Sequence, residues 1–429
     1  MLLLPEPTCG DNMTRRMTLP ATGRSQADIL AELRDMKGAD VDWKNGRAPL
    51  YVFKATDDVY EVGRAAFMEY FSENALGARR AFPSVKRMED EIVEMALDLF
   101  HAPEGAQGFM TTGGTESIIL AIQTCRDWSR GKRGDAKHRG NVVGAETLHP
   151  AFNKGAKLMD LEVRRAPVTG DLRMDLAAIE ALIDNDTIMM VGSAPNFPFG
   201  MIDPIAELGK IAERRGVWLH VDACVGGYLA PFVKLSGRKV ADFDFGVPAV
   251  SSLSADLHKF GFCPKPASTV FYRDADKARH HAFDADVWPN GRFLTSTIVG
   301  TRPAGGVAGA WATMQFLGMD GYTRVAAKLM DFVGAYQAAI RSTTGLKILG
   351  TPDLSIVSFG SDEFDVFRVA ELMNEKGWLA GLTQKPKGIH RMMSMFHEPV
   401  LDEYLDDLRA AIGVVRQAPP AEATMRATY

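Results

Sequence analysis

The amino-acid sequence predicts an α/β protein with a large, mostly parallel β-sheet and a small C-terminal α+β domain. Between residues 141 and 222, short apolar runs rich in β-branched residues alternate with amphipathic helical patterns. This alternation is typical of βαβ units, in which helices cover both faces of a parallel sheet. Nearer the C-terminus, a strand pattern over 354–359 precedes helical patterns over 364–376 and 401–414, which indicates a second, smaller domain.

The length of the chain sets the expected domain organisation. With 429 residues, it has room for two or three domains with large cores. We predict an N-terminal arm with helices over 1–80, a large α/β domain over 81–320 and a small α+β domain over 321–429. Residues 1–24 have the composition of a loose terminal arm, and the tail after Pro419 is expected to fray.

Helical patterns dominate the first hundred residues. Ser25 is a candidate N-cap for a helix that ends near Met36, and a second helix is expected over 57–71. After an irregular loop over 72–83, Ser84 is a candidate N-cap for a third helix. Four apolar side chains of that helix fall on one face: Met88, Ile92, Met95 and Leu99.

Strands and helices alternate through the central part of the chain. Strands are expected over 141–146, 161–164, 187–194, 217–221, 249–253 and 269–272. Helices are expected over 118–125, from 151 onwards, and over 175–183 and 204–214. From 307 to about 339, small and apolar residues indicate long helices that join the two domains.

Composition excludes several classes of protein. Hydrophobic residues make up 46% and charged residues 24%, as in ordinary soluble globular proteins, and a net charge of −5 gives no reason to expect a nucleic-acid partner. No apolar run reaches the length of about 18 residues that a membrane span needs, and residues 1–4 are too short a run for a signal peptide. The cysteines lack metal-binding or disulfide spacing, which predicts no metal site and a reducing, cytoplasmic setting: Cys9, Cys125, Cys224 and Cys263.

Two charged residues follow two of the predicted strands. Asp222 ends the 217–221 run and Lys259 follows the 249–253 run. Because the carboxyl ends of parallel strands meet at the ligand crevice of an open α/β sheet, both side chains are expected to face one ligand. Pyridoxal phosphate (PLP) uses such a pair: a lysine amine forms a Schiff base with its aldehyde, and a carboxylate keeps its pyridine nitrogen protonated. The alternative is that Asp222 caps a helix and Lys259 is a solvated surface lysine.

Two further features fit the same cofactor. Residues 111–117 (TTGGTES) precede an apolar helical run, and small residues at a helix start let backbone N–H groups approach a phosphate. The alternative is an ordinary helix cap with flexible glycines. His149 follows a predicted strand, where an imidazole can stack on a pyridine ring; the alternative is a structural histidine that caps the next helix.

Taken together, these segments resemble the sphingosine-1-phosphate lyase family, within the wider group of PLP-dependent decarboxylases. A glycine-rich loop alone is a weak signal, whereas eight segments in the family's order are specific. The resemblance implies the fold of the PLP-dependent transferases of fold type I. The segments are FPSV (82–85) with Glu89, TTGGTES (111–117), HPAFNKGA (149–156), GSAPNFPFGMIDP (192–204), HVDACVGGYLAPF (220–232), SADLHKFGFCPK (254–265), GTRP (300–303) and FDVFRVAELMNEKGW (364–378).

The resemblance also implies roles for residues of this sequence. Lys259 corresponds to the Schiff-base lysine, Asp222 to the partner of the pyridine nitrogen and His149 to the histidine that stacks on the ring. Lys265 corresponds to a lysine near the substrate phosphate, and Tyr51 to an active-site tyrosine. Three residues correspond to ligands of the PLP phosphate: Gly114, Thr115 and His258.

The implied assembly is a homodimer with active sites at the subunit interface, so the loops over 74–83 and 290–302 are expected to serve the neighbouring subunit's site. In the family, the first loop reads Asn-Pro-Leu-His-Pro-Asp and binds the substrate phosphate through its Asn and His. Here Asn74 is present and Gly77 replaces the histidine. Three arginines are candidates to bind the substrate's anionic group: Arg79, Arg80 and Arg302. Three further replacements affect the pocket, with Phe260 and Phe293 in place of tyrosines and Thr301 in place of a serine.

Three functions are compatible with these residues. The first is a carbon–carbon lyase that cleaves a phosphorylated long-chain amino alcohol to a fatty aldehyde and ethanolamine phosphate. The second is an amino-acid decarboxylase, which an arginine near the substrate carboxylate would favour: Arg79, Arg80, Arg292 or Arg302. The third is a non-catalytic protein with this fold, and the joint presence of Lys259, Asp222 and His149 argues against it.

Overall fold

The computed structural model describes residues 17–417 and 423–427. The chain forms two compact units, one up to Val41 and one from Asp42 onwards. In the first unit, helix α1 (Gln26–Met36) begins after Ser25, whose side chain accepts the N–H of Asp28, as predicted. Residues 17–24 are exposed and form neither helix nor strand. The rest of the arm predicted over 1–24, which includes Cys9, lies outside the described residues, and so does part of the predicted tail. The domain boundaries predicted at 80/81 and 320/321 stay predictions.

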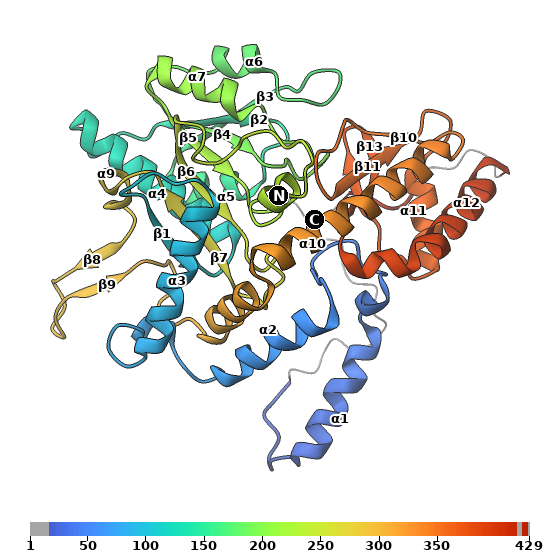
Figure 1. Cartoon of the computed structure of the whole chain (residues 1–429), viewed down its shortest axis with the longest axis horizontal. Helices are drawn as coiled ribbons and strands as arrows, with labels where there is room; N and C mark the ends of the chain where they lie inside the picture. The colour runs from blue at the N-terminus through green and yellow to red at the C-terminus, as the bar shows by residue number, and fades with distance from the viewer. Residues whose placement is uncertain (1–16, 418–422, 428–429) are drawn as a thin grey trace. The chain divides into compact units, whose positions relative to one another are not determined.

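A seven-stranded sheet forms the centre of the second unit, in the order β1-β7-β6-β5-β4-β2-β3 (Figure 1). Neighbouring strands from β3 to β6 pair in parallel, and β7 is antiparallel to both of its neighbours. The predicted mostly parallel sheet is therefore confirmed. Its strands are β1 (Gln107–Thr111), β2 (Asn141–Ala145), β3 (Glu162–Ala166), β4 (Thr187–Ser193), β5 (Trp218–Asp222), β6 (Val250–Ala255) and β7 (Ser268–Tyr272).

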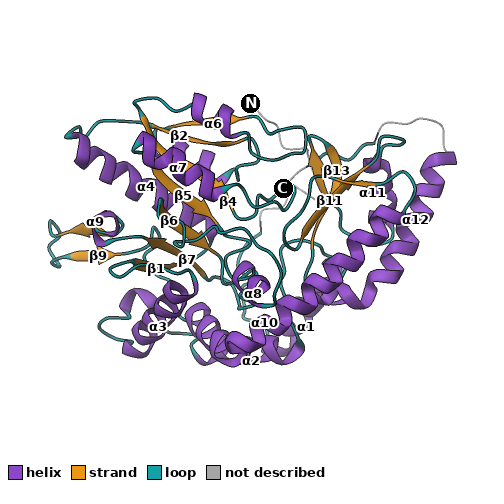
Figure 2. Cartoon of the chain, turned by 45° about the horizontal axis from the view of Figure 1, so that its top comes forward, coloured by secondary structure: helices purple, strands orange, loops and turns teal. Residues whose placement is uncertain are grey.

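Helices cover both faces of this sheet because its central strands are apolar on both faces (Figure 2). Successive residues of β4 belong to different cores: Met189 shares a cluster with side chains of α4 (Gly114–Arg133), and Met190 shares one with side chains of α7 (Ile205–Arg215). A Cβ at Gly192 would come within 2.4 Å of the Ile205 side chain, so this glycine lets α7 pack closely. Two shorter helices contact the same sheet, α5 (Ala151–Met159) and α6 (Leu176–Ala181).

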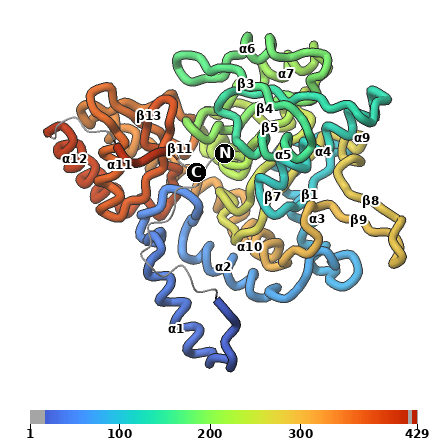
Figure 3. Tube along the Cα trace, turned by 180° about the vertical axis from the view of Figure 1, so that it is seen from behind, coloured from blue at the N-terminus to red at the C-terminus, as the bar shows by residue number. Residues whose placement is uncertain are grey.

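A second, antiparallel sheet lies beside the first in the C-terminal part of the chain, in the order β10-β11-β13-β12 (Figure 3). The long helix α10 (Gly305–Ser342) leads to it and breaks at Gly318, whose φ of 56° is outside the helical region. Helix α2 (Asp57–Glu69) packs along α10. The remaining C-terminal elements are β10 (Lys347–Ile348), β11 (Ile356–Gly360), α11 (Val366–Glu375), β12 (Gly381–Gln384), β13 (Lys387–Met392) and α12 (Leu401–Gln417).

Two local predictions differ from the structure. Helix α3 (Pro83–Leu99) begins at Pro83 rather than after Ser84, because proline lacks the N–H that a first helical residue leaves unpaired. The segment 290–302, expected to be a loop, includes strand β9 (Phe293–Thr295). This strand pairs with β8 (Phe283–Ala285) in a hairpin that projects from the sheet (Figures 1 and 3). Strands of three residues are too short to give a periodic signal. Two short helices complete the unit, α8 (Ala230–Leu235) and α9 (Ala275–Ala278).

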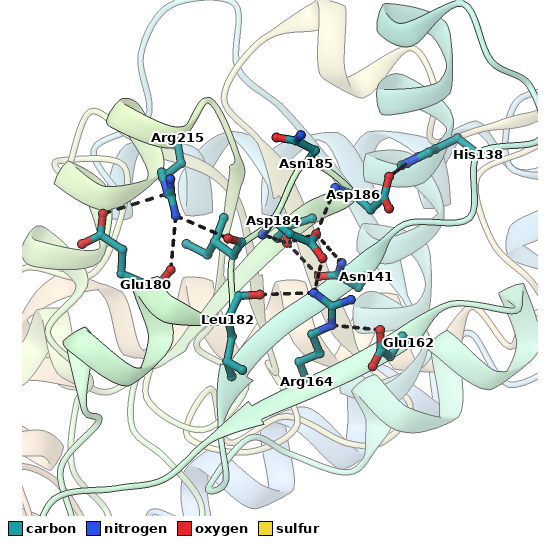
Figure 4. A network of polar contacts seen from close by, with 12 residues as sticks. His138, Asn141, Glu162, Arg164, Glu180, Leu182, Asp184, Asn185, Asp186 and Arg215 are labelled. Carbon is teal, nitrogen blue, oxygen red and sulfur yellow. Dashed lines mark hydrogen bonds and ion pairs between the residues drawn. The ribbon is translucent and has the colours of Figure 1, made fainter.

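A polar network ties together the amino-terminal ends of strands β2 and β4 and strand β3 (Figure 4). Arg164 of β3 donates to Asp184 at 2.5 Å, and Asn141 of β2 donates to the same carboxylate at 3.0 Å. The hydroxyl of Thr187 on β4 also donates to it. These hydrogen bonds, led by the one from Arg164, lower the pKa of Asp184.

We expect Asp184→Asn to destabilise the fold by about 1 kcal/mol at neutral pH, a small value because the carboxylate is 45% exposed. Since folding lowers the pKa of Asp184, its stabilisation is complete above the unfolded pKa and is lost as the pH falls through the folded value. The difference in Tm between wild type and variant should therefore shrink between pH 7 and pH values of about 3 and below. Glu104→Gln, at an exposed position, is the matched control. A difference independent of pH would contradict this reading.

Candidate active site

A cavity of about 390 Å³ lies at the carboxyl ends of β4, β5 and β6. It is the edge at which ligands bind in open α/β sheets. All six predicted cofactor residues line it: Gly114, Thr115, His149, Asp222, His258 and Lys259. The structure thus brings together groups from four separate segments of the sequence.

The first turn of α4 forms one wall of this cavity. The helix starts at Gly114 with no side-chain cap, so its first N–H groups and the positive end of its dipole face the cavity. A Cβ at Gly114 would come within 2.8 Å of both Asp256 Oδ2 and Cys224 Sγ. Close packing, rather than flexibility, therefore requires glycine here, and the surface suits a phosphate group.

Lys259 pairs with a residue to which sequence analysis assigned no role. Its Nζ lies 2.8 Å from Oδ2 of Asp256, a buried carboxylate that also accepts a hydrogen bond from Ser268. Burial alone would lower the pKa of Lys259, but Asp256 outweighs it and the pKa rises. Burial alone would raise the pKa of Asp256, but Lys259 and His258 lower it. The one feature of the sequence that could have predicted this ion pair is spacing, since Asp256 lies three residues before Lys259.

Asp222 ends β5 as a nearly buried carboxylate that accepts the N–H of Cys224 at 3.1 Å. It lies neither on a helix nor in an ion pair with Lys259. Its placement on the cavity wall matches the predicted partner of a pyridine nitrogen.

Two histidines complete the cavity. Nδ1 of His149 accepts the N–H of Ala151, the first residue of α5, which agrees with the structural alternative. The ring also lines the cavity, and its stacking role stays a prediction. Nδ1 of His258 accepts the N–H of Ala267. Burial is the main reason why the pKa of each histidine is lowered, so both rings are neutral near pH 7. A neutral ring whose Nδ1 accepts a hydrogen bond carries its hydrogen on Nε2.

The predicted substrate residues lie elsewhere on this chain. Arg79 and Arg302 line a second cavity, of about 200 Å³, beside α3 and β9. Oδ1 of Asn74 accepts the N–H of Arg302 at 3.3 Å. The guanidinium of Arg302 is buried in an ion pair with Glu89 at 2.8 Å. Arg80 is exposed and, like the others, does not line the cofactor cavity.

Tyr51 and Lys265 are also absent from the cavity wall. Tyr51 is half exposed and has a positive φ of 72°, an uncommon backbone conformation for a non-glycine residue. Lys265 is close enough to the cavity for its charge to contribute to the lowered pKa of His258. The roles predicted for these substrate residues stay predictions.

Comparisons with known proteins identify the family. Residues 73–361 match the pyridoxal-dependent decarboxylase conserved domain, which defines the class of protein. The chain is 37% identical to the sphingosine-1-phosphate lyase of Oryza sativa subsp. japonica over 95% of its own length and 76% of that protein. The solved structure of the sphingosine-1-phosphate lyase of Burkholderia pseudomallei K96243 superposes with a TM-score of 0.89 at 34% identity, covering 94% of each chain. The chain belongs to the sphingosine-1-phosphate lyase family.

Membership in this family makes the chain a PLP-dependent lyase. The fold is shared more widely: a glutamate decarboxylase of Lactobacillus brevis superposes with a TM-score of 0.83 at 20% identity. Among residues 17–417 and 423–427, no three His, Cys, Asp or Glu side chains are grouped to hold a metal ion. Within the same ranges, no helix has the length and apolar character needed to cross a bilayer. A cytoplasmic location stays a prediction.

We expect Gly114→Ala to weaken PLP binding about 10- to 100-fold, because the added methyl group would push Asp256 or the helix start away from the cofactor. Titration of the apoenzyme with PLP, followed by cofactor absorbance, measures the dissociation constant. Gly170→Ala is the control, because a Cβ there meets nothing within 4 Å. Equal affinities for the two variants would refute the close-packing argument.

Proposed function

We propose that the protein cleaves a phosphorylated long-chain amino alcohol, such as sphingosine 1-phosphate, to a fatty aldehyde and ethanolamine phosphate. The observation that carries this proposal is a third cavity, of about 410 Å³, which shares His149 and Phe197 with the cofactor cavity as lining residues. Its wall is mainly apolar and includes Leu50, Phe199 and Leu382. Such a wall suits a hydrocarbon chain attached to a reacting head group.

When bound, PLP supplies an electron sink for the pair of electrons released from the C2–C3 bond. Lys259 would hold the cofactor aldehyde, and Asp222 would keep the pyridine nitrogen protonated. Loss of the proton on the C3 hydroxyl turns C3 into the aldehyde carbon, while C2 gains a proton to become ethanolamine phosphate. Once its amine is released, Lys259 can keep a proton beside Asp256, 2.8 Å away.

Within a single chain, the positions of the arginines give no support to the amino-acid decarboxylase. An arginine near the substrate carboxylate would favour a decarboxylase, and Arg79, Arg80, Arg292 and Arg302 were the candidates. No arginine in the described part of the chain lines the cofactor cavity. Arg302 pairs with Glu89, and Arg292 pairs with Asp284.

The proposal includes a homodimer in which the segments 74–83 and 290–302 serve the partner's site. Several large apolar side chains of the hairpin and of the segment after it are exposed, which supports an interface there: Phe283, Val287, Trp288, Leu294, Ile298 and Val299. A dimer would also let Asn74 and Arg79 contact the substrate in the partner's site, since neither residue lines the cofactor cavity of its own chain.

Product analysis of the purified, PLP-loaded protein tests the function. We expect sphingosine 1-phosphate to yield aldehyde and ethanolamine phosphate in equal amounts, and a panel of amino acids to yield no carbon dioxide. Lys259→Ala should lower the rate at least about a thousandfold, because the amine that holds the cofactor is lost. Carbon dioxide from an amino acid, without lipid cleavage, would replace this proposal with the decarboxylase.

The hydrocarbon cavity makes a separate prediction. Leu382→Trp should raise KM for a long-chain substrate about tenfold, because the larger ring fills the space that the chain needs. The KM of a short-chain phosphorylated amino alcohol should change little. Leu235→Trp, at a position that is 58% exposed, is the matched control. An equal rise in KM for both substrates would show that the hydrocarbon chain of the substrate does not bind in this cavity.

A further inference from the structure

Glu116 connects two segments that are far apart in the sequence. It lies in the first turn of α4, is 7% exposed and lines the cofactor cavity. Its Oε2 accepts hydrogen bonds from the backbone N–H of Thr112 at 2.7 Å and from the hydroxyl of Thr112 at 2.8 Å. Its Oε1 accepts the backbone N–H groups of Ile298 at 2.8 Å and Val299 at 3.3 Å.

The chemistry of this site needs a carboxylate. An ionised carboxylate has two oxygens and about four acceptor positions, and here four donors occupy them, two from each segment. A glutamine of the same shape would present one oxygen and one NH₂ group. One of the two segments would then direct a backbone N–H at this NH₂ group, inside a buried site where an unmade hydrogen bond is costly. Only the hydroxyl of Thr112 could turn to accept from it.

The segment that Glu116 holds is fixed again at its far end. Asn74 donates through Nδ2 to the hydroxyl of Thr301 at 3.4 Å and accepts the N–H of Arg302. The N–H of Ala75 donates to the carbonyl of Arg302 at 2.9 Å. Ile298 is 54% and Val299 is 40% exposed, so the two residues that Glu116 binds contribute little apolar packing within their own chain. Their position therefore depends largely on hydrogen bonds, with the cofactor cradle at one end of the segment and Asn74 at the other.

We propose that Glu116 is a positioning residue that couples occupancy of the cofactor phosphate site to the placement of residues 297–302. A phosphate bound at the start of α4 would hold the first helical turn. That turn carries Glu116 and is joined to Thr112, so holding it also holds the carboxylate that anchors Ile298 and Val299. The inference rests on the proposed function in one respect, that Asn74 and Arg302 belong to the substrate side of the site.

Amide hydrogen exchange on the full-length protein, with and without PLP, tests this coupling. In wild type, PLP should slow exchange at Ile298 and Val299 at least about tenfold. In Glu116→Gln, exchange at these amides should be at least about tenfold faster than in the wild-type holoenzyme and should respond little to PLP. The amides of β5 report whether the fold is intact, and Glu94→Gln, at an exposed position of the neighbouring helix α3, is the matched control.

Two results would overturn the proposal: PLP leaving Ile298 and Val299 unchanged in wild type, or Glu116→Gln retaining wild-type protection with PLP bound. If Glu116→Gln does not fold, Thr112→Val removes one donor to Oε2, and a loss of protection of about threefold is then expected at Ile298. Unchanged protection in that variant would also refute the coupling. Because no lipid enters these measurements, their failure is distinct from a failure of the wild-type protein to cleave sphingosine 1-phosphate.

A kinetic measurement separates positioning from a general loss of structure. With PLP at saturation, Glu116→Gln should raise KM for the phosphorylated substrate about tenfold while kcat falls by less than about threefold. A fall in kcat with unchanged KM would assign Glu116 to cofactor chemistry instead and would contradict the proposed role.

Discussion

The parallel pairing of β5 with β6 is the constraint on which the rest of the site depends. Asp222, the last residue of β5, is in register with Ser254, so the chain leaves both strands at the same edge of the sheet. Asp256 and Lys259 follow β6 directly. Both strands are buried on both faces, so a slip in their register would disturb packing on each side and would separate Asp222 from Asp256 and Lys259.

At this edge of the sheet, the two buried carboxylates have different partners. Asp256 takes up the ammonium charge of Lys259, which leaves Asp222 free of that ion pair on the cavity wall. The two histidines stay neutral because burial lowers their pKa values, so they add hydrogen-bonding groups to the cavity without adding charge. The start of α4 adds positive potential through backbone N–H groups. One carboxylate is thus assigned to the lysine and the other remains for the cofactor ring.

The three cavities divide the work of a lipid-cleaving enzyme among different surfaces. The cofactor cavity holds the reactive groups, and an apolar cavity shares His149 and Phe197 with it. The cavity beside α3 and β9 is bordered by Arg79 and Arg302. Glu116 joins the cofactor cradle to the segment that borders this cavity, because it accepts hydrogen bonds from Thr112 on one side and from Ile298 on the other. Through this link, a chain can position residues that lie away from its own cofactor cavity.

The sequence by itself determined the parts of this protein that depend on local pattern. Apolar periodicity located the parallel strands. The positions of Asp222 and Lys259 after two of them suggested the cofactor, and the resemblance carried by eight ordered segments implied it. Short elements could not be predicted from the sequence. The strands of the β8–β9 hairpin, for example, have three residues each, which is too few to show an alternating pattern. Only the tertiary structure decided which partners meet. Lys259 forms an ion pair with Asp256, Arg302 forms one with Glu89, and Glu116 accepts the backbone N–H of Ile298. These contacts join segments whose separation depends on the packing of the whole sheet, and spacing along the chain does not encode such distances.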